Sequence, residues 1–112
     1  MLEWINYYSE RWNLEPLEKA HQIVNFLEEK KAEKIVLLDI REVATFADYF
    51  IICTGTSERM LEALASSLRE FVKKELDFIF VVEGASGDGW LVADLDDIVI
   101  HLFSPEMRNY YK

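Results

Sequence analysis

The sequence predicts an α/β domain in which a mixed five-stranded sheet packs against two main helices. Three patterns in its 112 residues support this fold class. Residues 16–31 and 57–74 carry apolar side chains at helical spacing. Three apolar runs of strand length are joined across helices, and residues 83–103 hold two further runs that alternate with a two-residue period. The last two runs predict a hairpin, so parallel and antiparallel pairs should coexist in one sheet.

The stretch 83–103 organises the predicted sheet. Its two runs meet at Asp96-Asp97, and a two-residue turn there gives one wholly apolar face, with Leu95 opposite Ile98, Ala93 opposite Ile100 and Leu91 opposite Leu102. The other face is mixed and pairs Asp94 with Val99, Val92 with His101 and Trp90 with Phe103. We expect the apolar face to pack on the core and the mixed face to carry the function. A register shifted by one residue would exchange the two faces.

The first half of the chain supplies one helix and two strands. Pro16 suits the first helical position, and the apolar stripe that follows comprises Leu17, Ala20, Ile23, Val24, Leu27 and Lys31. Residues 35–40 predict a strand buried on both faces, because the run is almost wholly apolar. Residues 41–47 form a connection to a second apolar strand at residues 48–53, in which Cys53 is expected to be an inert core thiol.

The second half begins with the turn Thr54-Gly55-Thr56-Ser57, where Ser57 or Thr56 can cap the following helix. The stripe of that helix comprises Met60, Leu61, Leu64, Leu68, Phe71 and Val72. Residues 78–82 predict a third apolar strand, and Ser104-Pro105 predicts a short last helix. Two helices cover only one face of five strands, so the second face needs another cover. The N-terminal segment, a second copy of the chain and a partner are the three candidates.

Residues 1–12 are expected to be an N-terminal extension ahead of a domain at residues 13–112. Its apolar residues lie at helical spacing and predict a short amphipathic segment that docks on a partner or packs on its own domain; they are Trp4, Ile5, Tyr8 and Trp12. The extension has an early acidic residue and no basic region, so a signal peptide is not expected. No apolar run is long enough to span a membrane, and a single cysteine fits a reducing cytoplasm.

The charge balance points to a protein partner. The chain carries 21 acidic and 12 basic side chains, a formal net charge of −9. Affinity for nucleic acids comes largely from Lys and Arg, so direct nucleic-acid binding is disfavoured as the main contact. A basic protein is favoured, because complementary charge speeds the encounter and fixes the register of docking. An acidic surface that serves only solubility is the alternative.

Two patterns are compatible with an enzyme. Asp94-Leu95-Asp96 places two carboxylates on one side of a strand, as in nucleotidyltransferases that hold a divalent metal. Residues 83–97 contain no basic residue to balance a nucleotide, so neither a metal site nor a cofactor is expected, and a metal-dependent nucleotidyltransferase-like enzyme stays the alternative. Asp94 could also raise the pKa of His101 in an acid–base couple. No nucleophile context accompanies them, which favours a structural hydrogen bond and no catalytic residue.

A cluster of acidic residues accompanies Trp90 in the same stretch. It comprises Glu83, Asp88, Asp94, Asp96 and Asp97. A tryptophan within a charged rim is typical of the energetic centre of a protein interface. A solvated loop with Trp90 folded inward is the alternative. We favour a partner-binding patch.

Two motif blocks resemble the ribosomal silencing factor RsfS (Iojap) family. The first is Ala47-Asp-Tyr-Phe-Ile-Ile-Cys-Thr-Gly-Thr-Ser57 with Arg59, and the second comprises Glu83-Gly84, Gly89-Trp90, Asp94 and the run from Asp97 to Phe103. The resemblance runs from about Leu17 to Tyr110 and identifies residues 13–112 as an RsfS-like domain. Its motif positions with structural roles are Asp48, Gly55, Thr56, Ser57 and Gly84. Two departures are that residues 1–12 precede the usual start and that Met60 stands where a histidine is common.

The resemblance implies a nucleotidyltransferase-like fold without transferase activity, in a cytoplasmic repressor of translation that is often a dimer. It implies binding to the large ribosomal subunit through a basic ribosomal protein, the universal large-subunit protein fourteen. Bound there, the factor would sterically prevent the small subunit from joining when nutrients are scarce. We expect the docking surface to comprise Trp90, Asp94, His101, Phe103, Glu83, Asp88, Asp96 and Tyr49.

Overall fold

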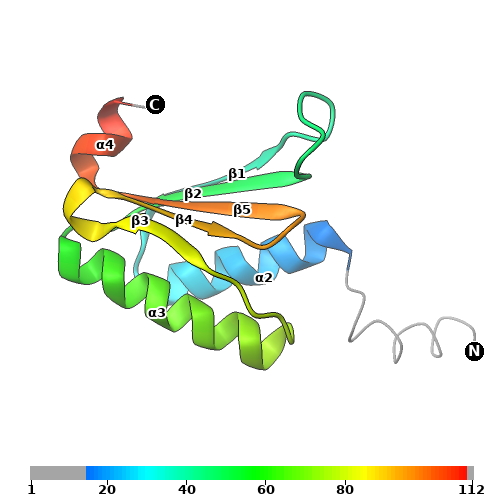
Figure 1. The fold of residues 1–112 in the computed structure, drawn as a ribbon, viewed down its shortest axis with the longest axis horizontal. Helices are drawn as coiled ribbons and strands as arrows, with labels where there is room; N and C mark the ends of the chain where they lie inside the picture. Colours follow the sequence, from blue (N-terminus) through cyan, green and yellow to red (C-terminus); the bar gives the residue numbers. More distant parts are fainter. Residues whose placement is uncertain (1–14, 111–112) are drawn as a thin grey trace, which may run out of the picture.

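Five strands form one mixed sheet with both long helices on the same face. The structure, a computed structural model, describes residues 15–110, so the predicted amphipathic segment at residues 1–12 lies outside the described residues. The elements are α2 (Pro16–Glu29), β1 (Glu33–Asp39), β2 (Tyr49–Thr54), α3 (Glu58–Glu75), β3 (Val82–Ala85), the 3-10 turn η1 (Ser86–Asp88), β4 (Trp90–Asp94), β5 (Ile98–Phe103) and α4 (Pro105–Tyr110) (Figure 1). The sheet order is β1-β2-β5-β4-β3, with β2 and β5 parallel and the other pairs antiparallel. The predicted α/β class is confirmed.

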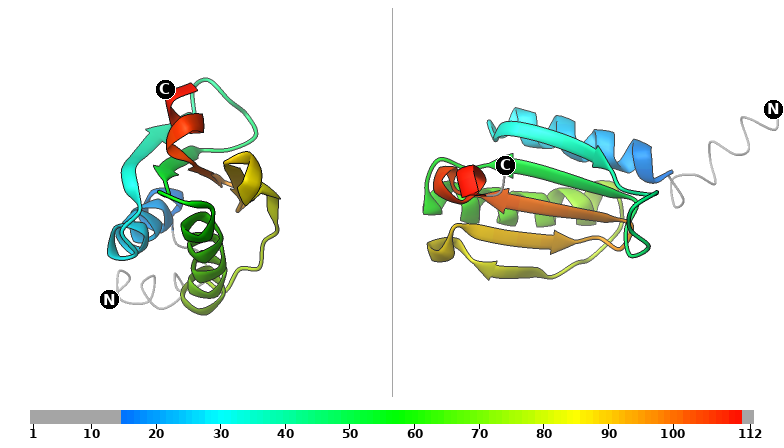
Figure 2. Two further views of the ribbon diagram at one scale, coloured as in Figure 1. Left: turned by 90° about the vertical axis from the view of Figure 1, so that its left-hand side faces the viewer. Right: turned by 90° about the horizontal axis from the view of Figure 1, so that it is seen from above.

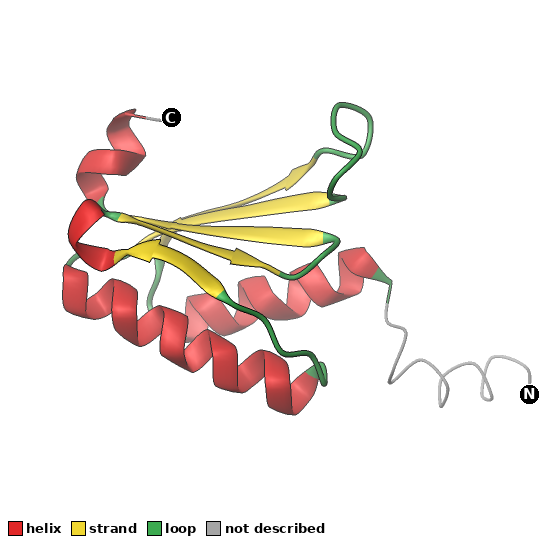
Figure 3. Ribbon diagram, viewed as in Figure 1, coloured by secondary structure: helices red, strands yellow, loops and turns green. Residues whose placement is uncertain are grey.

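The helix starts predicted from the sequence are confirmed. Pro16 lies in the first turn of α2, and the hydroxyl of Ser57 accepts a hydrogen bond of 3.1 Å from the backbone N–H of Met60 at the start of α3. Both helices lie on the same side of the sheet (Figure 3), and most of the residues that they bury belong to their apolar stripes. The fully buried centre between the helices and the sheet includes Ile23, Leu27, Ile51, Leu61, Leu68, Ile98, Ile100 and Leu102.

The register predicted for the hairpin of β4 and β5 is also confirmed. Trp90 lies opposite Phe103, Val92 opposite His101 and Asp94 opposite Val99. The turn closes through a 2.8 Å bond from the N–H of Leu95 to the carbonyl of Ile98. Asp96 takes a positive φ of 74° in this turn, which an aspartate tolerates better than most residues. The apolar face of the hairpin therefore packs on the helices, and the mixed face points away from them.

Two predictions about the strands are wrong. Residues 35–40 are not buried on both faces, because one side of β1 lies on the sheet face away from α2 and α3, where Val36 and Leu38 are 38% and 40% exposed. Residues 78–82 do not form the third strand, since β3 spans Val82–Ala85 and most of the predicted run lies before it. The pairing explains this shift: Val82 lies opposite Ala93, and β4 ends one residue later at Asp94, which leaves residues 78–81 without a strand to pair with.

The sheet surface opposite α2 and α3 is the feature that matters for function. We call it the open face and define it by Val36, Leu38, Phe50, Ile52, Glu83, Ala85, Trp90, Val92, Asp94, Val99, His101 and Phe103. The connection between β1 and β2 and the short helix α4 stand at its two ends, and no described element lies over its middle (Figures 1 and 2). A small second core at one end joins Ile40, Ala47 and Val99. Among the described residues, no helix is both long enough and apolar enough to cross a membrane.

Candidate partner-binding face

Four rings form the centre of the open face. The indole N–H of Trp90 donates a 3.3 Å hydrogen bond to Nδ1 of His101. The His101 ring stacks on Phe103 at 5.9 Å between centroids and meets the edge of Phe50 at 4.8 Å. Trp90 and His101 are half-buried, so the rings form a surface rather than a closed core. Because they come from three adjacent strands, the sheet itself fixes their geometry.

His101 is the titratable group at this centre. Its Nδ1 accepts from Trp90, so the neutral ring carries its proton on Nε2. Burial lowers the pKa of His101 below its ordinary value of 6.5. The Nε2 atom is buried and has no hydrogen-bond partner among the described residues. The residue is therefore a neutral donor in the middle of an aromatic surface.

The structure forms neither the acid–base couple nor the structural hydrogen bond that the sequence predicted between Asp94 and His101, so both predictions are wrong. Asp94 is exposed, and its Oδ1 accepts a 2.9 Å bond from the backbone N–H of Asp96 in the hairpin turn. Nδ1 of His101 is already held by Trp90. Desolvation therefore lowers the pKa of His101, whereas a nearby carboxylate of Asp94 would have raised it. Asp94 shapes the turn instead of activating the ring.

The acidic residues are distributed unequally around the face. Glu83, Asp94 and Asp96 are exposed, with Glu83 directly opposite Val92 on the edge strand. Asp97 is engaged by Lys19 of α2 at 2.9 Å and ties the hairpin turn to that helix. Asp88 lies apart in η1, where it lines a cavity of about 290 Å³ with the starts of α3 and α4. Three of the predicted acids thus lie on or beside the open face.

Tyr49 and Phe103 are less accessible than the predicted docking surface requires. Tyr49 is 4% exposed and pairs with Ile98, on the sheet face that packs against the helices. Its ring lies 5.4 Å below the guanidinium of Arg41. Phe103 belongs to the open face but is only 5% exposed, so it supports Trp90 from below.

The motif positions have structural explanations. The backbone of Asp48 accepts from Ile40 and donates to Asp97, which joins the ends of three strands. The N–H of Gly55 donates to the carbonyl of Phe103 at 2.9 Å, and Ser57 caps α3 while Thr56 stays exposed beside it. Gly84 has a φ of 99°, and a Cβ there would collide with the carbonyl oxygen of Trp90. Only glycine therefore fits at this position, which lies opposite Leu91 of β4.

Sequence reasoning missed a set of exposed apolar residues at the rim of the open face. Val43 and Phe46, in the connection between β1 and β2, are 84% and 66% exposed. The ring of Phe46 lies 6.0 Å from that of Phe50 and so continues the aromatic surface. The sequence did contain a signal for these two residues, because large apolar side chains are unusual in a short polar connection. They extend the candidate site beyond the hairpin.

The remaining reactive groups do not gather into a site. No group of three or more His, Cys, Asp or Glu side chains that could hold a metal lies among residues 15–110. Cys53 is buried, and burial raises the pKa of its thiol to about 12, as expected for an inert core thiol.

The comparisons with known proteins agree with the motif blocks. Residues 13–112 match the RsfS family model, described as "Ribosomal silencing factor during starvation". The chain belongs to the RsfS family. It is 36% identical to ribosomal silencing factor RsfS of Halalkalibacterium halodurans over 88 residues, which are 79% of this chain and 75% of that protein. It is 31% identical to the chloroplastic protein Iojap of Zea mays over 101 residues, 87% of this chain and 42% of that protein.

A solved structure shares the fold. A crystal structure of a protein from Chromobacterium violaceum superimposes with a TM-score of 0.80 at 31% identity, covering 88% of this chain and 82% of that one. Membership in the RsfS family makes this protein a ribosome regulator without enzymatic activity. The metal-dependent enzyme that Asp94 and Asp96 suggested is therefore set aside.

Proposed function

We propose that this RsfS protein binds the large ribosomal subunit through its universal protein fourteen and blocks joining of the small subunit. Translation would then be repressed when nutrients are limiting. The single observation that supports this proposal most strongly is the open face. A ribosome regulator without a catalytic site must act through a surface, and this is the largest uncovered sheet surface in the described part of the chain.

The chemistry of the open face suits a basic protein. Its centre is apolar and aromatic, and Glu83 and Asp94 lie exposed toward one edge, with Asp96 in the adjacent turn. Interfaces typically bury an aromatic anchor inside a polar rim, with about 800 Å² per partner. Trp90 is the anchor in this proposal, because the sheet holds it rigidly and it is half-buried before docking. The exposed acids would contact Lys or Arg of the ribosomal protein.

Co-sedimentation with purified large subunits tests the proposal. The variant Trp90→Ala with Asp94→Lys and Asp96→Lys removes the anchor and reverses two charges at the rim. We expect binding to be lost, since removal of one central anchor alone costs about 2–4 kcal/mol of binding free energy. A matched control reverses two acids on the opposite side of the molecule, Glu70→Lys with Glu75→Lys on α3, and should still co-sediment. Undiminished binding by a folded triple variant would refute the site.

Three further features remain predictions. We propose a cytoplasmic location, a homodimer and a nucleotidyltransferase-like fold. Sedimentation analysis over a dilution series measures the second of these directly, because dissociation of a dimer depends on protein concentration.

A further inference from the structure

We propose that residues 79–85 form a docking edge for an extended segment of another protein, which would join the five-stranded sheet as a sixth strand beside β3. That segment would carry two apolar side chains at alternate positions and a Lys or Arg two positions further along. The inference goes beyond the proposed function, because it concerns the free backbone edge of β3 and a partner segment that pairs with it.

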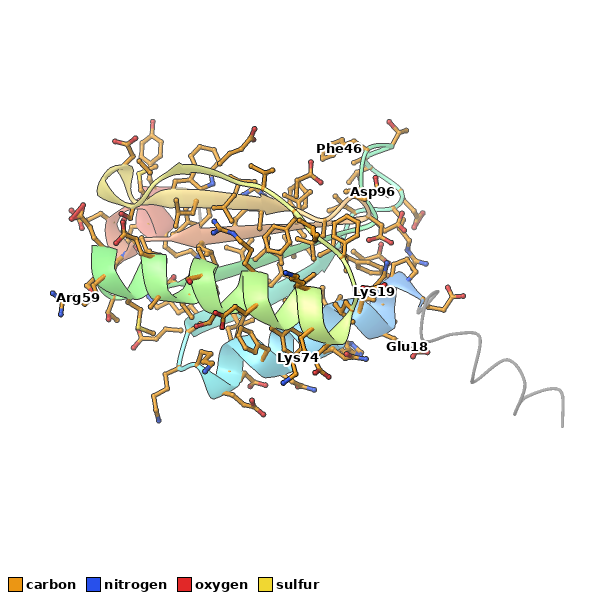
Figure 4. The ribbon with its side chains drawn as sticks, turned by 60° about the horizontal axis from the view of Figure 1, so that its bottom comes forward. Glu18, Lys19, Phe46, Arg59, Lys74 and Asp96 are labelled. Atoms are coloured by element: carbon orange, nitrogen blue, oxygen red, sulfur yellow. The ribbon has the colours of Figure 1, made fainter. Side chains whose placement is uncertain are left out.

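The docking edge has unpaired backbone groups. β3 lies at one edge of the sheet, and β4 is its only neighbouring strand among the described residues (Figure 2). Before β3, the chain leaves α3 just beyond Lys74 and rises to this edge (Figure 4). No hydrogen bond between backbone groups joins residues 79–81 to another described residue. The outer side of the whole edge can therefore accept a ladder of hydrogen bonds from an added strand.

The side chains of this edge alternate as they do in a strand. Phe80 is 6% exposed and belongs to the core between the sheet and the helices, and Val82 packs against the same core. Ile79 and Val81 are 77% and 73% exposed. Because alternate side chains of an extended chain share a face, Ile79, Val81 and Glu83 form one exposed row. The inner row is occupied, and the outer row has no cover among the described residues.

An exposed apolar edge of this kind is a liability unless it has a partner. Proteins usually protect a sheet edge with a charge or a proline, because an unprotected edge pairs with other chains. Residues 78–82 read Phe-Ile-Phe-Val-Val and contain neither. Acidic residues flank this run, Asp77 on one side and Glu83 on the other. The edge is therefore open to an added strand, and the flanking acids select against acidic ones.

The exposed row defines the segment that fits. A strand added to this edge would place apolar side chains opposite Ile79 and Val81 and a cation opposite Glu83. In antiparallel pairing the partner reads cation, any residue, apolar, any residue, apolar, and in parallel pairing the order is reversed. The net charge of −9 also favours a basic segment. The occupant is thus a basic, extended segment with alternating apolar side chains.

A second copy of the chain fits the docking edge less well. Two such edges paired antiparallel, in the register that matches their apolar runs, would place Asp77 of each copy opposite Glu83 of the other. The other edge strand, β1, has an irregular register between Glu33 and Val36, where Lys34 takes a positive φ of 50°. Such an irregularity disturbs the ladder that an added strand needs. A different protein is therefore the better occupant.

A synthetic peptide tests the docking edge in the full chain. The probe is the capped peptide Thr-Lys-Thr-Val-Thr-Val-Thr, and its matched control has every inner amide N-methylated, so it cannot donate to a ladder. We expect the probe, titrated to about 1 mM, to shift the NMR signals of residues 79–85 and to slow the exchange of alternate amides there. No shift at that concentration, or equal shifts with the N-methylated peptide, would overturn the inference.

Variants of the edge show whether the apolar row carries the contact. Ile79→Lys with Val81→Lys changes two exposed side chains, so the protein should fold, and it should bind the probe about tenfold more weakly. The matched control Leu17→Lys changes a 42% exposed apolar side chain on α2 and should leave the affinity unchanged. Equal affinity of the two variants for the probe would contradict the assigned edge.

A charge exchange tests the preference for a basic partner. Glu83→Lys should weaken binding of the probe by up to about fivefold, and a peptide with Glu in place of its Lys should recover the loss. Tighter binding of that acidic peptide by the unchanged protein would refute the basic partner. Assembly of the chain with itself that Ile79→Lys with Val81→Lys abolishes in sedimentation would identify a second copy as the occupant and overturn the inference. None of these measurements uses ribosomes, so they are independent of the proposed function.

Discussion

Replacing Trp90 by Phe should reveal how the centre of the open face is held together. The substitution keeps an aromatic ring and removes the N–H that donates to Nδ1 of His101. At 3.3 Å the bond is longer than the usual 2.9–3.0 Å and lies on a half-buried surface, so we assign it about 0.5–1 kcal/mol. The smaller ring loses further packing against Phe103, and the total loss of unfolding free energy should be about 1–2 kcal/mol.

The same change should alter how the protein responds to acid. Burial lowers the pKa of His101, so the folded state favours the neutral ring and the unfolded state takes up a proton first as the pH falls. The stability that His101 contributes is therefore present above about pH 6.5 and is lost as the pH falls below it. The Trp90 N–H bonds only to the neutral ring. Removing this hydrogen bond should raise the pKa of His101, so less stability should be lost as the pH falls.

Urea denaturation and a proton NMR titration of the imidazole signals measure both effects. A double-mutant cycle of Trp90→Phe and His101→Leu separates the hydrogen bond from the lost packing, with an expected coupling of about 0.5–1 kcal/mol. His21 is exposed on α2 and provides a reference signal in the same spectra. A coupling energy near zero, together with an unchanged or lower pKa of His101 in the Trp90 variant, would refute the reasoning.

Three other predictions concern the domain that presents the face. Gly84→Ala should destabilise the protein by about 1–3 kcal/mol in urea denaturation, because of its positive φ and the collision with Trp90, whereas Gly87→Ala should cost less than about 1 kcal/mol. Leu102→Ala removes a fully buried side chain from the middle of the sheet and should cost about 3–5 kcal/mol, so a shift of less than a few degrees in Tm would contradict its place in the core. The Cys53 thiol, with a pKa of about 12, should resist a thiol reagent at neutral pH until the protein unfolds, and stoichiometric labelling of the native protein would contradict its burial.

The sequence contained the hairpin of β4 and β5 in full, down to its register. The reason is local: alternation with a two-residue period fixes which side chains share a face, and a two-residue turn at Asp96-Asp97 gives a pairing in which one face is wholly apolar. The helix starts signalled by Pro16 and by the cap Ser57 were equally local. Such features depend only on neighbours along the chain, so the chain alone specifies them.

The features that the sequence did not reveal depend on distant partners. The runs at residues 35–40 and 78–82 have strand-like composition, yet the burial of the first depends on whether an element covers its outer face, and the pairing of the second depends on how far β4 extends alongside it. The side of the sheet on which Tyr49 lies follows from the parallel pairing of β2 with β5, across 49 residues of chain. Burial among rings from three strands lowers the pKa of His101, and its Nδ1 accepts a hydrogen bond from Trp90 while Asp94 bonds to the backbone of the hairpin turn. Non-local pairing decides each of these cases.

The acidic surplus of the chain and its uncovered aromatic surface are physically linked. A rigid surface with Trp90 and His101 at its centre and Phe46 at its rim is attractive to any apolar surface, including that of a second molecule. A net charge of −9 disfavours acidic partners and attracts a basic protein. The apolar centre would therefore supply affinity and the charge would supply selection between partners. Neutralising Glu83 and Asp94 together, by Glu83→Gln and Asp94→Asn, should weaken the response of ribosome binding to salt while leaving the aromatic contact in place.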